Sequence, residues 1–326
     1  MMAIKTMKVE NFTVFKNMEV EFSPGINVFI GENGTGKTHL LKLLYVANAM
    51  HIASGYTIDI RDVFGNNFKS NGCRFVIDGD DSHPWTLSGI STPTGTKLNP
   101  PHSYIHVDFE NKAPAVFIPA KEVLSLSNIT RVADEYKRTL NIDITITDII
   151  DKARKLVPDV VSDFAIEITK TLENQIGGKT FFDEKDGTFW IQKANNINIP
   201  FTSEAEGYKK LGLLWQLIMN KSITENTVLL WDEPEANLSR LHTSALVDML
   251  IELSRHGVQV FIATHDYNLM KYFSIKKKNS DQVAFISLYK GDEGIVCEYE
   301  DDYDLLKHNA IIDADIKLLE DEIEEG

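Results

Sequence analysis

An octapeptide near the N-terminus, residues 31–38, has the composition and spacing of a phosphate-binding loop. It reads Gly-Glu-Asn-Gly-Thr-Gly-Lys-Thr and fits the pattern G-x-x-x-x-G-K-[ST] at every fixed position. In such a loop, backbone N–H groups enclose a phosphate, the lysine neutralises the β- and γ-phosphates, and the hydroxyl binds Mg²⁺. We therefore expect Thr38 to be a metal ligand and Lys37 to serve catalysis as well as binding. The residues expected to bind nucleotide are Asn33, Gly34, Thr35, Gly36, Lys37, Thr38 and His39.

The flanking sequence supplies the elements that such a loop needs. The apolar residues 26–30 predict a buried strand, and residues 39–45 predict the start of a helix. A helix that begins at the loop directs its positive dipole end toward the phosphate. An accidental match to the octapeptide is the alternative, and the second half of the chain argues against it.

Two later apolar runs end in side chains that would complete phosphate chemistry. Residues 227–231 lead into Asp232 and Glu233, and residues 258–263 lead toward His265. An aspartate at the tip of a buried strand is how a Mg²⁺ ligand is placed beside a phosphate loop, and the next carboxylate could orient an attacking water. We predict that Asp232 binds Mg²⁺, that Glu233 is catalytic, and that His265 senses the γ-phosphate. A turn-capping Asp-Glu pair and a structural histidine are the alternatives.

These elements, in this order, resemble the ABC-type ATPase heads of the SMC/RecF/OLD group. Residues 7–27 resemble the opening strand pair of the group, and residues 233–238 resemble its D-loop. Residues 117–125 resemble a segment of bacterial stand-alone OLD-like ATPases of the AAA type, many of which are encoded in anti-phage defence loci. The resemblance implies an α/β P-loop NTPase with an ABC-type head, which has a mixed central sheet and an antiparallel β lobe. The D-loop residues that it implies are Glu235, Ala236 and Asn237.

One segment departs from the pattern of the group. The signature motif of the group is a Ser-Gly-Gly-like turn that opens a helix and contacts the γ-phosphate held by a second subunit. Here Ala205 takes the place of the serine and is followed by Glu206 and Gly207. Ser203 could substitute if the turn is shifted by two residues, and backbone N–H groups at the helix start could carry the contact. The residues expected there are Ser203, Ala205, Glu206 and Gly207, ahead of a helix whose apolar face holds Leu211, Leu214, Trp215 and Ile218.

Composition and pattern divide the chain into four parts. We expect an N-terminal ATPase half with the β lobe over residues 1–122, and a helical and hairpin insert over 123–200, with the hairpin turn at Asp186-Gly187. The C-terminal ATPase half then covers 201–291, and an acidic segment covers 292–326. The insert lacks the sustained heptads of a long coiled coil, which disfavours chromosome tethering.

The net charge of −15 is concentrated at the C-terminal end. Residues 292–326 hold fourteen acidic residues against two lysines, so little net charge is left for the rest of the chain. A basic surface elsewhere remains compatible with this balance, and Lys276-Lys277-Lys278 is one candidate, although such a run is usually a solvated loop. Within the acidic segment, an apolar stripe recurs at helical spacing. We expect it to pack on its own domain, with docking to a basic partner as the alternative; its members are Ile312, Ile316, Leu319 and Ile323.

Little in the sequence supports a membrane protein or a metal site. No apolar run approaches the roughly 18 residues of a membrane span, and no signal-peptide pattern opens the chain, so we expect a cytoplasmic protein without a membrane partner. Cys73 and Cys297 are expected to be free thiols. His106 and Asp108 alternate with apolar residues, which favours a half-exposed strand over a metal site that includes His102.

The sequence therefore predicts an ATPase whose product is a conformational state. Two heads would enclose two ATP molecules with Mg²⁺ across a two-fold interface, as a homodimer or a higher assembly, with Phe15 or Lys16 beside the adenine. The preferred role is control of a separately encoded effector, a nuclease or toxin, in anti-phage defence. A RecF-like repair factor that binds nucleic acid, and a switch that binds ATP without turnover, are the alternatives.

Overall fold

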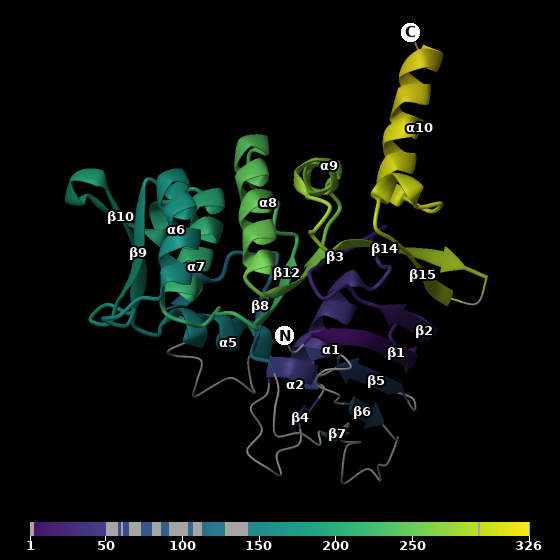
Figure 1. Cartoon of the computed structure of the whole chain (residues 1–326), viewed down its shortest axis with the longest axis horizontal. Helices are drawn as coiled ribbons and strands as arrows, with labels where there is room; N and C mark the ends of the chain where they lie inside the picture. The colour runs from purple at the N-terminus through teal and green to yellow at the C-terminus, as the bar shows by residue number, and fades with distance from the viewer. Residues whose placement is uncertain are drawn as a thin grey trace.

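Two six-stranded sheets and one three-stranded sheet form the framework of the computed structural model (Figure 1). The structure describes residues 3–49, 58–59, 61–64, 73–79, 86–90, 104–106, 113–127, 143–292 and 294–325. All statements about contacts below concern these residues. Among their helices, none has both the length and the apolar character to cross a membrane.

The central sheet has the strand order β15-β14-β3-β13-β12-β8. Its five strands from β14 to β8 run parallel, and β15 pairs antiparallel with β14. Every residue of β3, β12 and β13 is buried, as expected for parallel strands with both faces covered. The strands are β15 (Gly294–Glu300), β14 (Val283–Gly291), β3 (Ile26–Gly31), β13 (Gln259–Ala263), β12 (Val228–Asp232) and β8 (Ala115–Ile118).

Alternate side chains of these strands enter two separate apolar clusters. Val28 and Ile262 face a cluster to which several helices contribute, whereas Phe29 and Phe261 face a cluster with α1 and the antiparallel sheet. Figure 1 shows the same layers, with α1 and the antiparallel sheet below the central sheet. The helices are α1 (Lys37–Ala49) on that side, and α6 (Asp163–Ile176), α7 (Glu206–Met219), α8 (Arg240–Arg255) and α9 (Tyr267–Lys276) on the other.

The second six-stranded sheet confirms the predicted antiparallel lobe and its opening strand pair. Its order is β2-β1-β5-β6-β7-β4, and all of its pairings are antiparallel. The expected strand around His106 exists as β7, while His102 and Asp108 lie outside the described residues. The elements are β1 (Ile4–Phe12), β2 (Phe15–Glu21), β4 (Ile58–Asp59), β5 (Arg74–Gly79), β6 (Thr86–Ile90), β7 (Tyr104–His106) and the short α2 (Arg61–Phe64).

Helices and a hairpin follow β8, as the sequence of the insert predicts. Helix α6 ends at Gly177, which adopts the left-handed conformation with φ 69° that favours glycine at a helix C-terminus. The hairpin turns at Asp186-Gly187, and Gly187 also has a positive φ of 71°. Residues 128–142 of the insert lie outside the described ranges. The remaining elements are η1 (Leu124–Leu126), α5 (Ile144–Ala153), β9 (Gly178–Asp183), β10 (Thr188–Lys193), η2 (Ala194–Asn196), β11 (Asn198–Pro200) and η3 (Phe201–Ser203).

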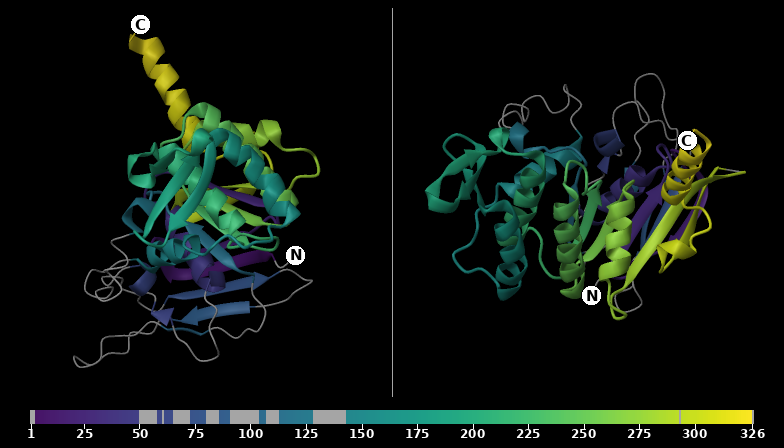
Figure 2. Two further views of the ribbon diagram at one scale, coloured as in Figure 1. Left: turned by 90° about the vertical axis from the view of Figure 1, so that its left-hand side faces the viewer. Right: turned by 90° about the horizontal axis from the view of Figure 1, so that it is seen from above.

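The C-terminal helix corrects one expectation. After η4 (Tyr303–Leu305), helix α10 (Ala310–Glu325) leaves the body of the molecule (Figures 1 and 2). Ile312 packs against the core, but Ile316, Leu319 and Ile323 are 49%, 58% and 80% exposed. The prediction that this stripe packs on its own domain is therefore wrong beyond the first turn. Periodicity identified the apolar face, but the direction of the helix axis carries that face past the end of the domain.

Candidate functional site

The phosphate-binding loop joins β3 to α1, as its sequence predicts. Gly31, Gly34 and Gly36 have φ angles of 145°, 82° and 93°, a region that side chains other than glycine rarely adopt. A Cβ atom on Gly36 would lie 2.4 Å from the Phe15 ring, and one on Gly31 would lie 2.3 Å from the Leu288 carbonyl oxygen. The loop thus requires glycine both for its turn and for its close packing on the two sheets.

Lys37 is buried at the first position of α1. Its Nζ atom donates hydrogen bonds to the carbonyl oxygens of Gly31 (2.7 Å) and Glu32 (3.0 Å). Burial lowers the pKa of Lys37 to about 8, against the opposing effect of the nearby carboxylates. A cation held under the loop in this way adds positive potential where a polyphosphate would lie.

Thr38 and Asp232 meet at the same edge of the central sheet. The Thr38 hydroxyl donates to Asp232 Oδ2 over 2.9 Å. Burial raises the pKa of Asp232, and the hydrogen bond from Thr38 opposes that shift. A hydroxyl and a carboxylate oxygen are the hard ligands that Mg²⁺ accepts together with phosphate oxygens and water, so the donor set fits this ion.

Glu233 and His265 lie beside this pair. The Glu233 backbone has a positive φ of 45°; its N–H donates to the Ala263 carbonyl (2.8 Å), and its carbonyl accepts from Lys210 Nζ (2.9 Å). His265 Nε2 lies 3.7 Å from Glu233 Oε1, and His265 Nδ1 lies 3.5 Å from Lys37 Nζ. Burial and, to a lesser extent, Lys37 lower the pKa of His265, which favours the neutral imidazole. The structure therefore brings the three residues predicted to be catalytic together.

Three further polar residues, not singled out as catalytic or phosphate-contacting by sequence reasoning, complete the environment. Glu235 accepts from the Thr264 hydroxyl (2.6 Å) and from the His265 backbone N–H (3.4 Å). Burial raises the pKa of Glu235 to about 7 and lowers that of Lys210. A lysine that interrupts the apolar face of α7 was the signal for Lys210. Glu235 was expected only as a D-loop residue, and Thr264 carried no signal beyond its proximity to His265 in sequence.

The signature-like segment lies against the D-loop of its own chain. Ala205 precedes α7 without a side-chain capping bond, and a Cβ on Gly207 would lie 3.0 Å from Leu238. The Glu206 carboxylate accepts from Lys209 Nζ over 2.8 Å. Glu206, the acid at the second position of the signature motif, is thus paired with Lys209 within the same turn of the helix.

Phe15 and Lys16, the two residues expected beside the adenine, differ in exposure. Phe15 is only 1% exposed and packs beneath Gly36, so it supports the loop and has no face left for an adenine ring. That expectation is corrected, because the close approach of the β1–β2 hairpin to the loop uses the ring as packing. Lys16 is exposed and lies beside Gly294. His39, the last predicted loop residue, packs against Phe12 and Phe64.

A cavity of about 520 Å³ opens beside the phosphate-binding loop. The loop contributes Glu32 and Asn33, the strand end contributes His265, and the N-terminus of α8 contributes Arg240. The first turns of α10 form another wall. The lining residues on that wall are Ala310, Ile311, Ala314 and Asp315.

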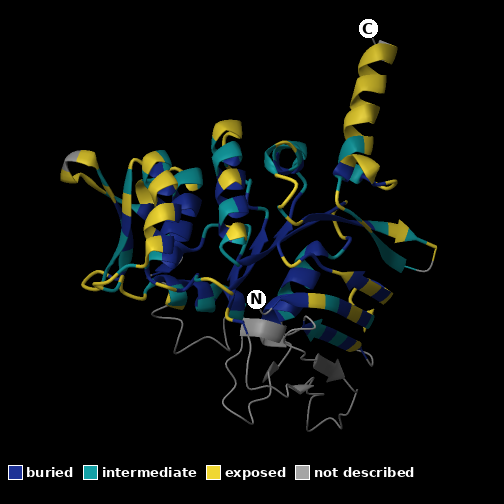
Figure 3. Ribbon diagram, viewed as in Figure 1, coloured by how far each residue is buried: buried dark blue, intermediate teal, exposed yellow. Residues whose placement is uncertain are grey.

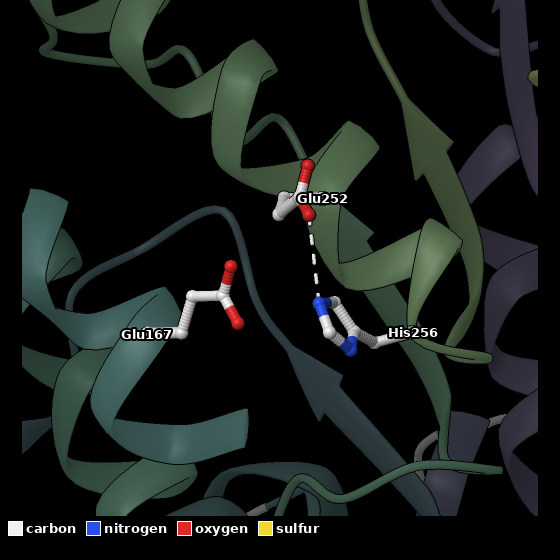
Figure 4. A group of neighbouring side chains, drawn as sticks. All are labelled: Glu167, Glu252 and His256. Atoms are coloured by element: carbon white, nitrogen blue, oxygen red, sulfur yellow. Dashed lines mark ion pairs between the residues drawn. The ribbon is translucent and has the colours of Figure 1, made fainter. Parts of the chain in front are cut away.

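A separate cluster joins α6 and α8. Among the described residues, Glu167, Glu252 and His256 place one potential metal-binding atom each within 4.8 Å of the others (Figure 4). Glu252 Oε1 lies 3.5 Å from His256 Nε2, and its Oε2 accepts from Arg255 Nη1 (3.0 Å). Within this cluster, Glu252 is thus ion-paired with His256 and with Arg255 at partly exposed positions.

Comparison with known families assigns the chain to ATPase domains. A family model described as "AAA ATPase domain" matches residues 2–82. A second model, described as "AAA domain, putative AbiEii toxin, Type IV TA system", matches residues 86–271, which is more than half of the chain.

Curated relatives match over short stretches. The DNA replication and repair protein RecF of Chlamydia abortus is 47% identical over 97 residues, which cover 30% of this chain and 26% of that protein. RecF of Phocaeicola vulgatus is 35% identical over 78 residues, which cover 24% of this chain and 19% of that protein. The chain thus matches about a quarter or less of the length of these relatives.

Solved structures match over nearly the whole chain. An Smc head domain with an extended coiled coil, bound to the C-terminal domain of ScpA from Pyrococcus furiosus, is 13% identical with a TM-score of 0.56. That match covers 98% of this chain and 99% of the other. An SmcHead bound to the C-winged helix domain of ScpA is 13% identical with a TM-score of 0.58, over 91% and 97%. The fold is that of an SMC head.

Proposed function

The chain belongs to the family described as "AAA domain, putative AbiEii toxin, Type IV TA system", and we propose that it hydrolyses ATP to switch between assembly states. Its SMC-head fold and its partial matches to RecF support membership of the ABC-type ATPases of the SMC/RecF group. The observation that carries the proposal is the hydrogen bond between Thr38 and Asp232, because it joins the two halves of a Mg²⁺ site beside the phosphate-binding loop.

Each polar group at the edge of the central sheet has a proposed task. Thr38 and Asp232 would hold Mg²⁺, which would supply positive charge to offset that of the phosphates. Lys37 would add positive charge to the β- and γ-phosphates, and the loop backbone from Asn33 onward would donate N–H groups to them. These residues bind and orient the triphosphate.

Glu233 is the proposed acceptor of the proton from the attacking water. Its backbone is held by Ala263 and Lys210, which fixes the point from which the carboxylate extends. His265, whose pKa is lowered by burial and by Lys37, would donate a hydrogen bond from a ring N–H to a γ-phosphate oxygen. Glu235 positions His265 through its backbone N–H and does not itself meet the phosphate.

A second copy of the chain is the proposed completion of the site. The exposed residues Ser203, Ala205 and Glu206 stand at the N-terminus of α7, where backbone N–H groups favour an anion. The pairing of Glu206 with Lys209 supports closure over a polyphosphate, because it offsets the acid that departs from the signature motif. The ATP-bound dimer would be isologous and would separate after hydrolysis.

Control of a separately encoded effector is the proposed biological role. The family description names a putative toxin and a Type IV toxin–antitoxin system, and the two SMC heads were solved with a bound partner protein. The resemblance to OLD-like ATPases supports a role in anti-phage defence. Two of the three lysines proposed for a basic surface are engaged within the chain, Lys276 with Asp248 and Lys277 with the Asp301 carbonyl. The matches to RecF keep a DNA-binding repair factor as the second candidate.

Phosphate release at varied Mg²⁺ concentration tests the proposed chemistry. Asp232→Asn should abolish Mg²⁺-dependent turnover, because the amide is a weaker ligand and leaves Thr38 without its anionic acceptor. Asp159→Asn, at an exposed position between α5 and α6, is the matched control and should behave as wild type. Unchanged Mg²⁺ dependence in Asp232→Asn would show that the metal site is assigned wrongly. Absence of turnover in the wild type, with ATP bound, would favour a binding-only switch.

A further inference from the structure

Helix α10 presents an apolar face that no described part of the chain covers. Its first turn contacts the end of β3, and the rest extends away from the domain (Figures 1 and 2). Figure 3 shows almost all of the helix as exposed. Ile316, Leu319 and Ile323 are each about half exposed or more. Apolar side chains in a continuous row of this kind are normally buried against a partner.

The row has the spacing of a coiled-coil seam. Successive members are Ile312, Ile316, Leu319 and Ile323, separated by four, three and four residues. This alternation corresponds to the d, a, d and a positions of consecutive heptads, which face a second helix and not a flat surface. Since an isolated helix of this length is only marginally stable in water, a partner helix would also stabilise α10.

The charges beside the seam specify the partner. The positions that flank the seam on both sides are acidic, and in heptad notation they are the e and g positions Asp313, Asp315, Glu320 and Glu322. In either relative orientation, a second copy of α10 would bring acid against acid across the interface. A helix with Lys or Arg at its flanking positions would bring opposite charges together at each of these places.

We propose that α10 is a docking helix for a helix of another protein that carries an apolar seam flanked by basic residues. The proposal defines the partner-binding surface within the proposed function, and it rests on that function only for the existence of a partner. The base of α10 lines the cavity beside Glu32, Asn33 and His265. The docking helix is thus connected at its base to the wall of the cavity beside the phosphate-binding loop.

A peptide of defined sequence tests the chemistry without knowledge of the natural partner. The probe is a synthetic peptide of about four heptads with Ile at a, Leu at d and Lys at e and g, and its own lysines disfavour self-pairing. Fluorescence anisotropy should show saturable binding to the full chain at about 0.15 M salt without nucleotide. A peptide with Glu at e and g, and a scrambled peptide of identical composition, should bind at least roughly tenfold more weakly.

Substitutions on α10 separate the seam from general electrostatic attraction. The double variant Ile316→Glu/Ile323→Glu should lose roughly tenfold or more in affinity for the lysine peptide, because it places charges within the seam. Leu318→Glu is the control: Leu318 is 66% exposed on the same helix but lies outside the seam. Its affinity should stay within about twofold of wild type, since it adds charge without touching the interface. Circular dichroism and thermal unfolding verify that each variant is folded.

Several outcomes would overturn the proposal. If the scrambled peptide bound equally well, charge alone would explain the binding. Equal losses in Leu318→Glu and in the double variant would exclude the seam. If light scattering showed wild-type dimers without nucleotide that the double variant abolished, α10 would pair with a second copy instead. All of these readings are independent of ATP turnover, so a failure here leaves the ATPase proposal intact.

Discussion

Thr38 donates a hydrogen bond to Asp232 across 2.9 Å, although 194 residues separate them in the chain. The contact exists because β12 and β3 lie on either side of β13 and run parallel to it. The carboxyl ends of parallel strands share one edge of the sheet, so the loop after β3 and the acid at the end of β12 converge there. A similar argument places His265, which follows β13, between them.

Removal of the buried lysine should abolish nucleotide-dependent behaviour. Lys37→Ala deletes the cation that bonds the loop carbonyls and that would face the β- and γ-phosphates. We expect ATP affinity, measured by equilibrium titration with a fluorescent analogue, to fall by about tenfold or more, with turnover lost. Lys170→Ala, at an exposed position of α6, is the control and should bind ATP normally. Wild-type turnover in Lys37→Ala would remove the central role of the loop.

Substitution of the switch histidine should separate rate from affinity. His265→Ala removes the ring that lies between Lys37 and Glu233 but leaves the phosphate-binding loop unchanged. Turnover should therefore fall by about 100-fold, while affinity for a non-hydrolysable ATP analogue changes by less than about threefold. If the loss of affinity matched the loss of rate, His265 would have a structural role only.

The buried carboxyl of Glu235 should make stability depend on pH. Burial raises its pKa from 4.5 to about 7, so the folded state holds this proton more tightly than the unfolded state does. The stabilisation is complete below pH about 4.5 and is lost as pH rises from there through about 7, which amounts to about 3 kcal/mol in the free energy of unfolding. One oxygen, Oε2, has no hydrogen-bond partner among the described residues, in keeping with a protonated group.

Denaturant unfolding between pH 5 and 8 checks this dependence. Glu235→Gln preserves a hydrogen-bond acceptor for Thr264 and has no charge to bury, so the variant should lose less stability than wild type over the same range. Because the Glu235 carboxylate also raises the pKa of Lys210 and of Lys37, the difference between the two curves reports Glu235 together with its effect on these two lysines. Parallel curves would mean that Glu235 is ionised in the folded chain throughout.

Sequence reasoning predicted the loop, the strand pair and the polar strand ends, because each is a local pattern with a local consequence. It identified the apolar stripe of α10 but expected the domain to cover it, since periodicity defines a face and not the surface opposite. The prediction that Phe15 lies beside the adenine was wrong for a similar reason, because only the packing of the β1–β2 hairpin on Gly36 shows that its ring is buried. The hydrogen bonds that Thr264 donates to Glu235 and that Lys210 donates to Glu233 join separate elements and depend on the folded arrangement.

The central claim, a dimer switch driven by ATP, is tested most directly by the mass of a trapped state. Glu233→Gln should bind ATP without hydrolysing it, because the amide keeps the shape of the side chain but cannot accept a proton. Its mass should be measured by light scattering with and without Mg-ATP, and the wild type with ADP serves as control. The account predicts a monomer that becomes a dimer only with Mg-ATP. A monomer with ATP bound, or a dimer indifferent to nucleotide, would contradict it.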